Sequence, residues 1–180
     1  LLAAEGDLPP TNVINLGLSG EFIRRLLDSG RYDKAVAKLP GLDYIFIRYG
    51  LNDVAKIQDF DAAFPKDFHE LLGRLREDHP AAMLIPMTVI PMSADLEADA
   101  PRANRINDLV RRVAAEEQLT CFDIYVRYAA EQARGPNMLN YRRFPLAKIP
   151  EKLRDVAKPY VMEQAGKDPM VEVLDNRLDA

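Results

Sequence analysis

Cysteine, histidine and tryptophan are scarce in this chain of 180 residues. It has one cysteine, Cys121, two histidines and no tryptophan. A single cysteine excludes an internal disulfide framework and any multi-cysteine metal site. It fits a reducing compartment without identifying one, so the sequence leaves localisation undetermined. We expect no metal ion and no cofactor.

Strongly basic stretches and long apolar runs are also missing. The net charge is −4, and acidic and basic residues are interspersed along the chain. This distribution disfavours a nucleic-acid partner, because a phosphate backbone is bound by a basic surface. No apolar run reaches the roughly 20 residues that cross a bilayer, so no membrane span is expected. The oligomeric state stays open.

The apolar content is sufficient for one sizeable core. Hydrophobic residues make up 48% of the chain, and the length fits one domain, which we expect over residues 1–180. The first residues, Leu1 to Gly6, are typical of the last turn of a helix followed by its glycine stop. We therefore expect natural sequence upstream of residue 1.

Hydrophobic periodicity predicts strands that alternate with helices. The run at 42–49 is apolar on both faces apart from Asp43 and Arg48, which is typical of a parallel strand buried between helices. This alternation predicts an α/β domain with a mainly parallel sheet and helices on both faces. We expect an irregular and helical insertion at 135–170. The predicted strands are 12–16, 42–49, 82–90 and 120–124, with a short apolar run at 171–174, and the predicted helices are 21–28, 59–77, 101–118, 124–134 and 151–164.

The loop Gly17 to Glu21 follows the first predicted strand, at the sheet edge where α/β proteins bind ligands. Glu21 would repel a phosphate at the helix N-terminus, so a phosphate-binding loop is disfavoured. The segment has glutamate where a Gly-x-Ser-x-Gly nucleophile turn, with Ser19 as nucleophile, requires its last glycine. Gly20 would suit a backbone N–H donor that approaches a ligand closely. A plain turn with Ser19 as the helix cap is the structural alternative.

The loop Gly50 to Asp53 follows the second predicted strand. Asn52 offers N–H donors without a charge, which suits the stabilisation of a developing oxyanion. The alternative is an Asx-turn, in which Asn52 or Asp53 bonds its own backbone.

The two loops together resemble the SGNH (GDSL-type) hydrolase family. The first strand ends Asn-Leu-Gly-Leu-Ser-Gly-Glu, and about 30 residues later the second ends Tyr-Gly-Leu-Asn-Asp. The resemblance implies that the N–H of Gly20 and the amide of Asn52 belong to an oxyanion hole. It also implies a three-layer, flavodoxin-like α/β/α sandwich, with probable strand order 2-1-3-4-5 and the first strand outside this sequence.

Two sequence blocks of that family do not occur in the chain. The family's nucleophile is a serine in a Gly-Asp-Ser block, whereas the three serines here are Ser19, Ser29 and Ser93. An Asp-x-x-His block is also lacking, and we expect His69 and His79 to be structural residues. The resemblance therefore implies that the nucleophile and its base lie outside these residues. We expect a domain incomplete at both ends, which would not fold stably alone.

The resemblance implies a serine ester hydrolase that acts on a small acyl or acetyl ester, its small-molecule partner. We expect Ser19, Arg48 and Asp53 to contact substrate, with Arg48 paired to Asp53 or Glu21 as the alternative. Two other functions stay open. One is a non-catalytic ligand-binding module on the same fold, and the other is an α/β-hydrolase with Ser19 as nucleophile.

Overall fold

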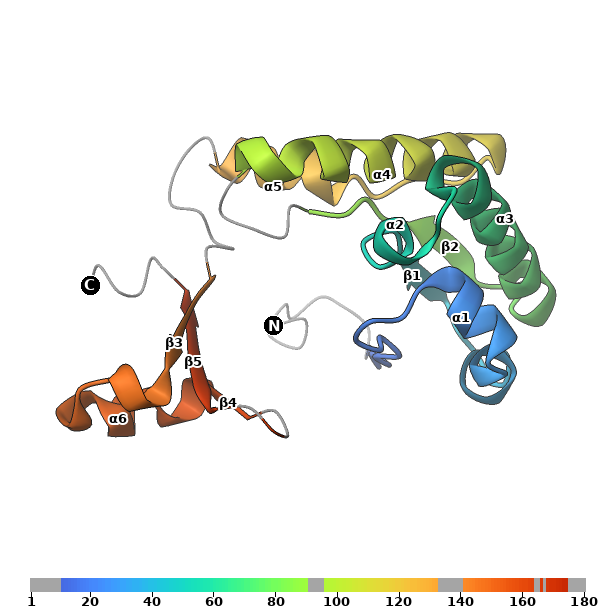
Figure 1. The fold of residues 1–180 in the computed structure, drawn as a ribbon. Helices are drawn as coiled ribbons and strands as arrows, with labels where there is room; N and C mark the ends of the chain where they lie inside the picture. The colour runs from blue at the N-terminus through green and yellow to red at the C-terminus, as the bar shows by residue number, and fades with distance from the viewer. Residues whose placement is uncertain (1–10, 91–95, 133–140, 164–165, 167, 175–180) are drawn as a thin grey trace. The chain divides into compact units, whose positions relative to one another are not determined.

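The computed structural model describes residues 11–90, 96–132, 141–163, 166 and 168–174, and shows an α/β protein (Figure 1). The chain forms two compact units, residues 1–85 and 86–180. The first unit holds both loops that the sequence predicts to be functional.

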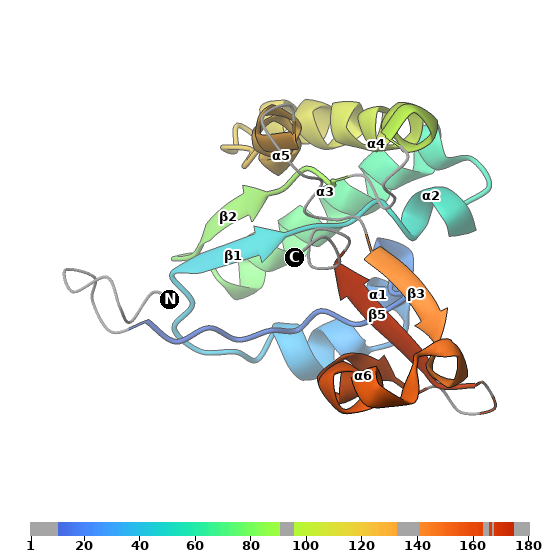
Figure 2. The same cartoon turned by 90° about the vertical axis from the view of Figure 1, so that its left-hand side faces the viewer.

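Helices and short strands alternate through the first unit. Strands β1 and β2 lie side by side in a two-stranded sheet (Figure 2), and β2 ends at the boundary between the units. A turn of π-helix at Tyr32–Val36 follows the first helix. The remaining elements are α1 (Ile23–Asp28), β1 (Tyr44–Ile47), α2 (Asp53–Lys56), α3 (Phe60–Asp78) and β2 (Met83–Pro86).

Helix α3 supplies half of the buried hydrophobic residues that are described in this unit. Its phenylalanines recur every four residues, and the rings of Phe60, Phe64 and Phe68 follow one another at centroid distances of 4.9 and 5.6 Å. This spacing places them on one face of the helix, and all three are buried. Helix α1 packs against α3 (Figure 1), and its Arg24 binds Asp67 of α3 at 2.6 Å.

The sheet formed by β1 and β2 has one buried face and one exposed face. Ile47 and Leu84 are buried, whereas Tyr44, Phe46 and Met83 are 60%, 61% and 56% exposed. Successive side chains of a strand point to opposite faces. The prediction of two-sided burial for 42–49 is therefore wrong, because no described element covers the second face.

The predicted strand at 12–16 is not formed. Residues 11–18 have no regular secondary structure, and Val13 and Ile14 are 73% and 47% exposed. A strand requires a hydrogen-bonded neighbour, and the described part of the chain provides none here.

The second unit begins with two helices that follow predicted strands. Helix α4 (Leu96–Glu116) buries Ile106, Val110 and Val113 at helical spacing, and α5 (Ile124–Gln132) follows it. The predicted strands 82–90 and 120–124 align in parallel at one bridge, between Met87 and Phe122. This pairing has the direction that the sequence predicts.

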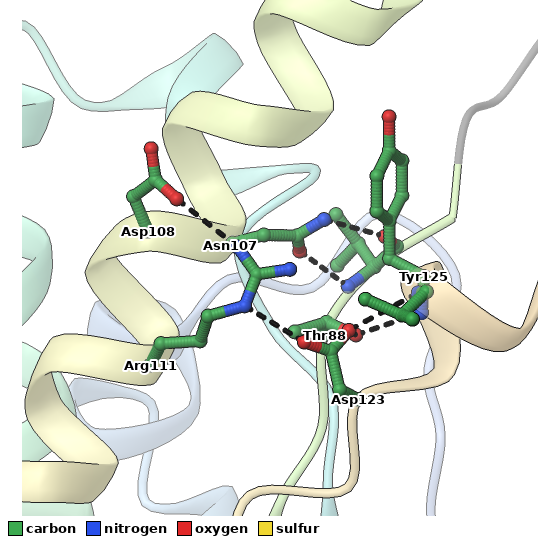
Figure 3. Close-up of polar contacts among 8 residues, drawn as sticks. Thr88, Asn107, Asp108, Arg111, Asp123 and Tyr125 are labelled. Atoms are coloured by element: carbon green, nitrogen blue, oxygen red, sulfur yellow. Dashed lines mark hydrogen bonds and ion pairs between the residues drawn. The ribbon is translucent and has the colours of Figure 1, made fainter. Parts of the chain in front are cut away.

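Polar side chains connect these elements within the second unit (Figure 3). The fully buried Asn107 of α4 accepts from the N–H of Val89 at 2.7 Å and donates to its carbonyl at 2.9 Å. Thr88 donates to Asp123 at 3.0 Å, and Arg111 donates to the other oxygen of Asp123 at 2.8 Å. The Asn107 carboxamide thus takes the place of a neighbouring strand for Val89.

The C-terminal part of the second unit is an antiparallel sheet, which the sequence did not predict. Strand β3 begins where an irregular segment was expected, and its order with its neighbours is β3-β5-β4. Helix α6 ends seven residues earlier than the predicted helix 151–164. The elements are β3 (Tyr141–Pro145), a 3₁₀ turn (Leu146–Lys148), α6 (Glu151–Ala157), a second 3₁₀ turn (Lys158–Tyr160), β4 (Val161–Met162) and β5 (Met170–Leu174).

Candidate active site

The first candidate loop is a tight turn that requires glycine. Gly20 has φ of +77°, and the N–H of Glu21 donates to the carbonyl of Leu18 at 3.1 Å. A positive φ at the third residue of a four-residue turn is typical of type II turns. Ser19 lies exposed on this turn. It does not cap helix α1, whose N-cap residue is Phe22.

The second candidate loop binds the first one through Asn52. The Asn52 Nδ2 donates to the backbone carbonyl of Glu21 at 2.9 Å, across 31 residues of sequence. Glu21 directly follows Gly20, so this bond links Asn52 to the residue next in sequence to the other predicted oxyanion-hole residue. A carboxamide nitrogen has two hydrogens, and this bond uses one of them.

Asp53 holds the same two loops together from the interior. It is fully buried. Its Oδ1 accepts from the N–H of Ile23, in the first turn of α1, and its Oδ2 accepts from the N–H of Gly50, both at 2.9 Å. Burial raises the pKa of Asp53, and the two backbone donors oppose that shift. Asp53 was expected to contact substrate, but the structure engages both of its carboxylate oxygens with backbone.

Glu21, the last residue of the first loop, is buried and forms a polar cluster with the half-buried Arg31 and Tyr49. The Glu21 side chain is 3% exposed, and its Oε2 accepts from Arg31 at 2.8 Å and from the Tyr49 hydroxyl at 2.9 Å. Its Oε1 is buried and has no hydrogen-bond partner in the part of the chain that the structure describes. Burial, and the bond to Glu21 after it, raise the pKa of Tyr49.

Arg48 does not form the ion pair that was considered for it. It is exposed, the cation beside Glu21 is Arg31, and the oxygens of Asp53 accept from backbone. The sequence did not single out Arg31 or Tyr49. The signal available was Glu21 itself, because an acidic residue beside a buried helix start requires donors nearby.

The other serines and histidines occupy different places. Ser29 is the C-cap residue of α1, and Ser93 falls outside the described residues. His69 lies within α3, and His79 directly follows that helix, where its Nε2 is 3.1 Å from the carbonyl oxygen of Val36.

Neither a metal site nor a membrane-spanning helix occurs among the described residues. In residues 11–90, 96–132 and the described C-terminal segments, no three His, Cys, Asp or Glu side chains are arranged to hold a metal ion. The helices of those same segments include none that is long and apolar enough to cross a membrane.

The comparison with protein families assigns the chain. Residues 1–144 match the family described as GDSL-like Lipase/Acylhydrolase. The match spans most of the chain and includes both candidate loops. The chain therefore belongs to the GDSL-like lipase/acylhydrolase family. No curated protein matches it.

Solved structures share the fold of this chain. One is a protein of Parabacteroides merdae described as a GDSL-like lipase, with TM-score 0.56, 15% identity, and coverage of 66% of this chain and 57% of the other. Another is an α/β hydrolase enzyme from the metagenome of Lake Arreo, Spain, with TM-score 0.55, 25% identity and coverage of 68% and 58%. A third is an acetyl xylan esterase with TM-score 0.55, 19% identity and coverage of 74% and 70%. The chain thus spans under three fifths of the first two proteins.

Proposed function

We propose that this chain supplies the oxyanion-binding part of a serine ester hydrolase acting on small acyl or acetyl esters. The observation that carries the proposal is the 2.9 Å hydrogen bond from Asn52 Nδ2 to the carbonyl of Glu21, the residue after Gly20. It brings together two loops that are 31 residues apart in sequence. Family membership supports the same reaction class.

The chemistry requires donors at the point where negative charge develops. A serine oxygen adds to the ester carbonyl carbon while a histidine takes the serine proton, and the carbonyl oxygen becomes an oxyanion. The bond between the acyl carbon and the alcohol oxygen then breaks, and the alcohol leaves with the proton from histidine. Water, deprotonated by the same histidine, then releases the acyl group from the serine as the acid. In this proposal, the Gly20 N–H and the second Asn52 N–H donate to the oxyanion. The serine and histidine are those of the family's Gly-Asp-Ser and Asp-x-x-His blocks.

The electrostatics of the two loops support this role. An oxyanion would be repelled by an unpaired carboxylate nearby, and two acidic residues adjoin the donors. Glu21 is paired with Arg31, and the charge of Asp53 is partly offset by the backbone N–H groups of Ile23 and Gly50, which donate to its two oxygens. The Asn52 side chain is neutral, so it can donate a hydrogen bond to the oxyanion without carrying a charge of its own.

The finer parts of the proposal concern fold and substrate. We propose that the complete domain is flavodoxin-like, with sheet order 2-1-3-4-5, and that Ser19 and Arg48 contact substrate, since both are exposed. An acetyl ester is favoured because a structure of the same fold is an acetyl xylan esterase.

Replacement of Asn52 by alanine in the complete protein tests the proposal. Loss of one oxyanion donor costs about 3–4 kcal/mol of barrier, so we expect kcat on an activated acetyl ester to fall about 10²–10³-fold. The control is Asn104→Ala, because Asn104 is an exposed asparagine of α4 in the other unit. An unchanged kcat for Asn52→Ala would rule out the proposed site.

Labelling with a fluorophosphonate separates the proposal from its two alternatives. We expect the complete protein to be labelled on a serine outside these 180 residues. A label on Ser19 would instead support the α/β-hydrolase alternative. The absence of any label would support a non-catalytic ligand-binding module.

A further inference from the structure

We infer that Arg31 is a positioning residue for the proposed oxyanion hole. Its side chain hydrogen-bonds both ends of the loop that contains Gly20, and so holds that loop in place. The inference rests on the proposed function and adds a residue that neither the sequence motifs nor the family match assigns. The residues concerned are the polar cluster of Glu21, Arg31 and Tyr49, in which Glu21 is buried.

Arg31 contacts the beginning and the end of the glycine loop at once. Its NH1 donates to Glu21 Oε2 at 2.8 Å, after Gly20, and its NH2 donates to the carbonyl of Leu16, before Gly17. A guanidinium presents several N–H donors in a rigid fork, so one side chain holds both acceptors in a defined separation. Arg31 is itself half-buried, with 26% of its side chain exposed.

The buried Glu21 carboxylate depends on Arg31 because it has few other hydrogen-bond donors. Among the described residues its Oε1 is buried without a partner, and its Oε2 accepts from Arg31 and Tyr49. Burying a carboxylate with an unpaired oxygen is costly. Without Arg31 the remaining donor is a neutral hydroxyl, so we expect Glu21 to leave its buried position.

Displacement of Glu21 would change the positions of both proposed donors, the Gly20 N–H and the Asn52 amide. The backbone carbonyl of Glu21 accepts from Asn52 Nδ2, and the peptide unit of Gly20 is covalently joined to Glu21. The cluster also adjoins the second loop, because Tyr49 immediately precedes Gly50. Arg31 would therefore act through the placement of Gly20 and Asn52, without contact to the substrate.

The test is Arg31→Lys in the complete protein, assayed on an activated acetyl ester. Lysine keeps the charge but has one nitrogen on a flexible stem, so it cannot hold both acceptors in the fork geometry. We expect kcat to fall about 10-fold or more while KM stays within about 2-fold, because donor placement matters in the transition state. A fall in kcat that merely follows loss of folded protein would overturn the inference.

Arg24→Lys is the matched control. The Arg24 guanidinium also bridges acidic side chains of the first unit, and these are Asp67, Glu70 and Asp28 at 2.6, 2.5 and 3.3 Å. We expect this variant to lower the unfolding midpoint and to leave kcat unchanged. Should Arg31→Lys not fold, Tyr49→Phe removes the second donor to Glu21 with a smaller perturbation, and we expect a kcat decrease of about 3-fold or more.

A double-mutant cycle with Asn52→Ala separates this inference from the proposed function. If Arg31 acts by placing the donors, Arg31→Lys should reduce kcat much less in the Asn52→Ala background than in the wild type. Additive effects of the two substitutions on the activation free energy would contradict the inference about Arg31 and leave the proposed function intact. An unaltered kcat in Asn52→Ala alone would instead remove the proposed function.

Discussion

At the scale of single residues, Gly20 adopts a backbone conformation that is favourable for glycine and costly for other residues. Its φ of +77° lies in the left-handed region, and a Cβ added there would meet nothing within 4 Å. The cost of a side chain at this position is therefore conformational and not steric. L-residues pay about 1–2 kcal/mol for this region.

Two glycine substitutions test this requirement against each other. We expect Gly20→Ala to lower the free energy of unfolding by about 1–2 kcal/mol. Gly73 in α3 also has nothing within 4 Å of an added Cβ, but its backbone is helical, so Gly73→Ala should raise stability by about 0.5–1 kcal/mol. Urea unfolding of the complete protein measures both changes. Equal changes in the two variants would contradict the assignment of strain to Gly20.

Some residue roles could be predicted from the sequence and others could not. The Gly-x-Asn-Asp motif singled out Asn52 because its type and spacing are local properties. The roles of Asp53 and Arg31 depend on partners at sequence separations of 30 and 10 residues. A motif does not show which of two adjacent polar side chains turns inward, so Asp53 was expected at the substrate.

At the scale of elements, helices were predicted more accurately than strands. Helix α3 was expected at 59–77 and is formed at Phe60–Asp78, because a helix satisfies its hydrogen bonds internally and its apolar stripe is visible in the sequence. The strand at 12–16 has the expected composition but no hydrogen-bonded neighbour among the described residues. The antiparallel β3 and β5 were missed because their pairing joins segments far apart in sequence.

The junction between Phe122 and α5 is expected to respond to acid through Asp123. Burial alone would raise the pKa of Asp123, but hydrogen bonds from Arg111, the Val126 N–H and Thr88 outweigh it, and the pKa lies below its ordinary value of 3.8. A depressed folded-state pKa contributes stability that is present above about pH 4 and is lost as pH falls further. We expect Asp123→Asn to lower the unfolding midpoint at pH 7, with the difference from wild type shrinking below pH 4.

A neighbouring carboxylate provides the control for this pH dependence. Asp108 pairs with the same Arg111 at 3.0 Å, but its side chain is 73% exposed. Exposed ion pairs contribute little, so Asp108→Asn should leave the midpoint nearly unchanged between pH 7 and pH 3. Thermal unfolding followed by circular dichroism over that range measures both variants. The expected sign would be contradicted if the difference in unfolding midpoint between wild type and Asp123→Asn grew on acidification.

At the scale of the whole molecule, the apolar surface is unevenly buried. Tyr44, Phe46 and Met83 share the exposed face of the β1–β2 sheet, whereas α3 in the same unit buries its entire phenylalanine stripe. The apolar sequence of 42–49 predicted burial on both sides, and the structure provides it on one. Large contiguous apolar surfaces are unusual on monomeric proteins. We therefore expect this face to bind apolar ligands.

An apolar dye should detect this face in the 180-residue chain. We expect 8-anilinonaphthalene-1-sulfonate to bind before heating, and the unfolding transition to be broad, because the exposed face adds no burial to stability. Phe46→Ser should reduce dye fluorescence without lowering the transition midpoint, since Phe46 is 61% exposed. Val126 on α5 is 57% exposed, and Val126→Ser should change neither quantity. A sharp, cooperative transition without dye binding would show that the face is covered in solution.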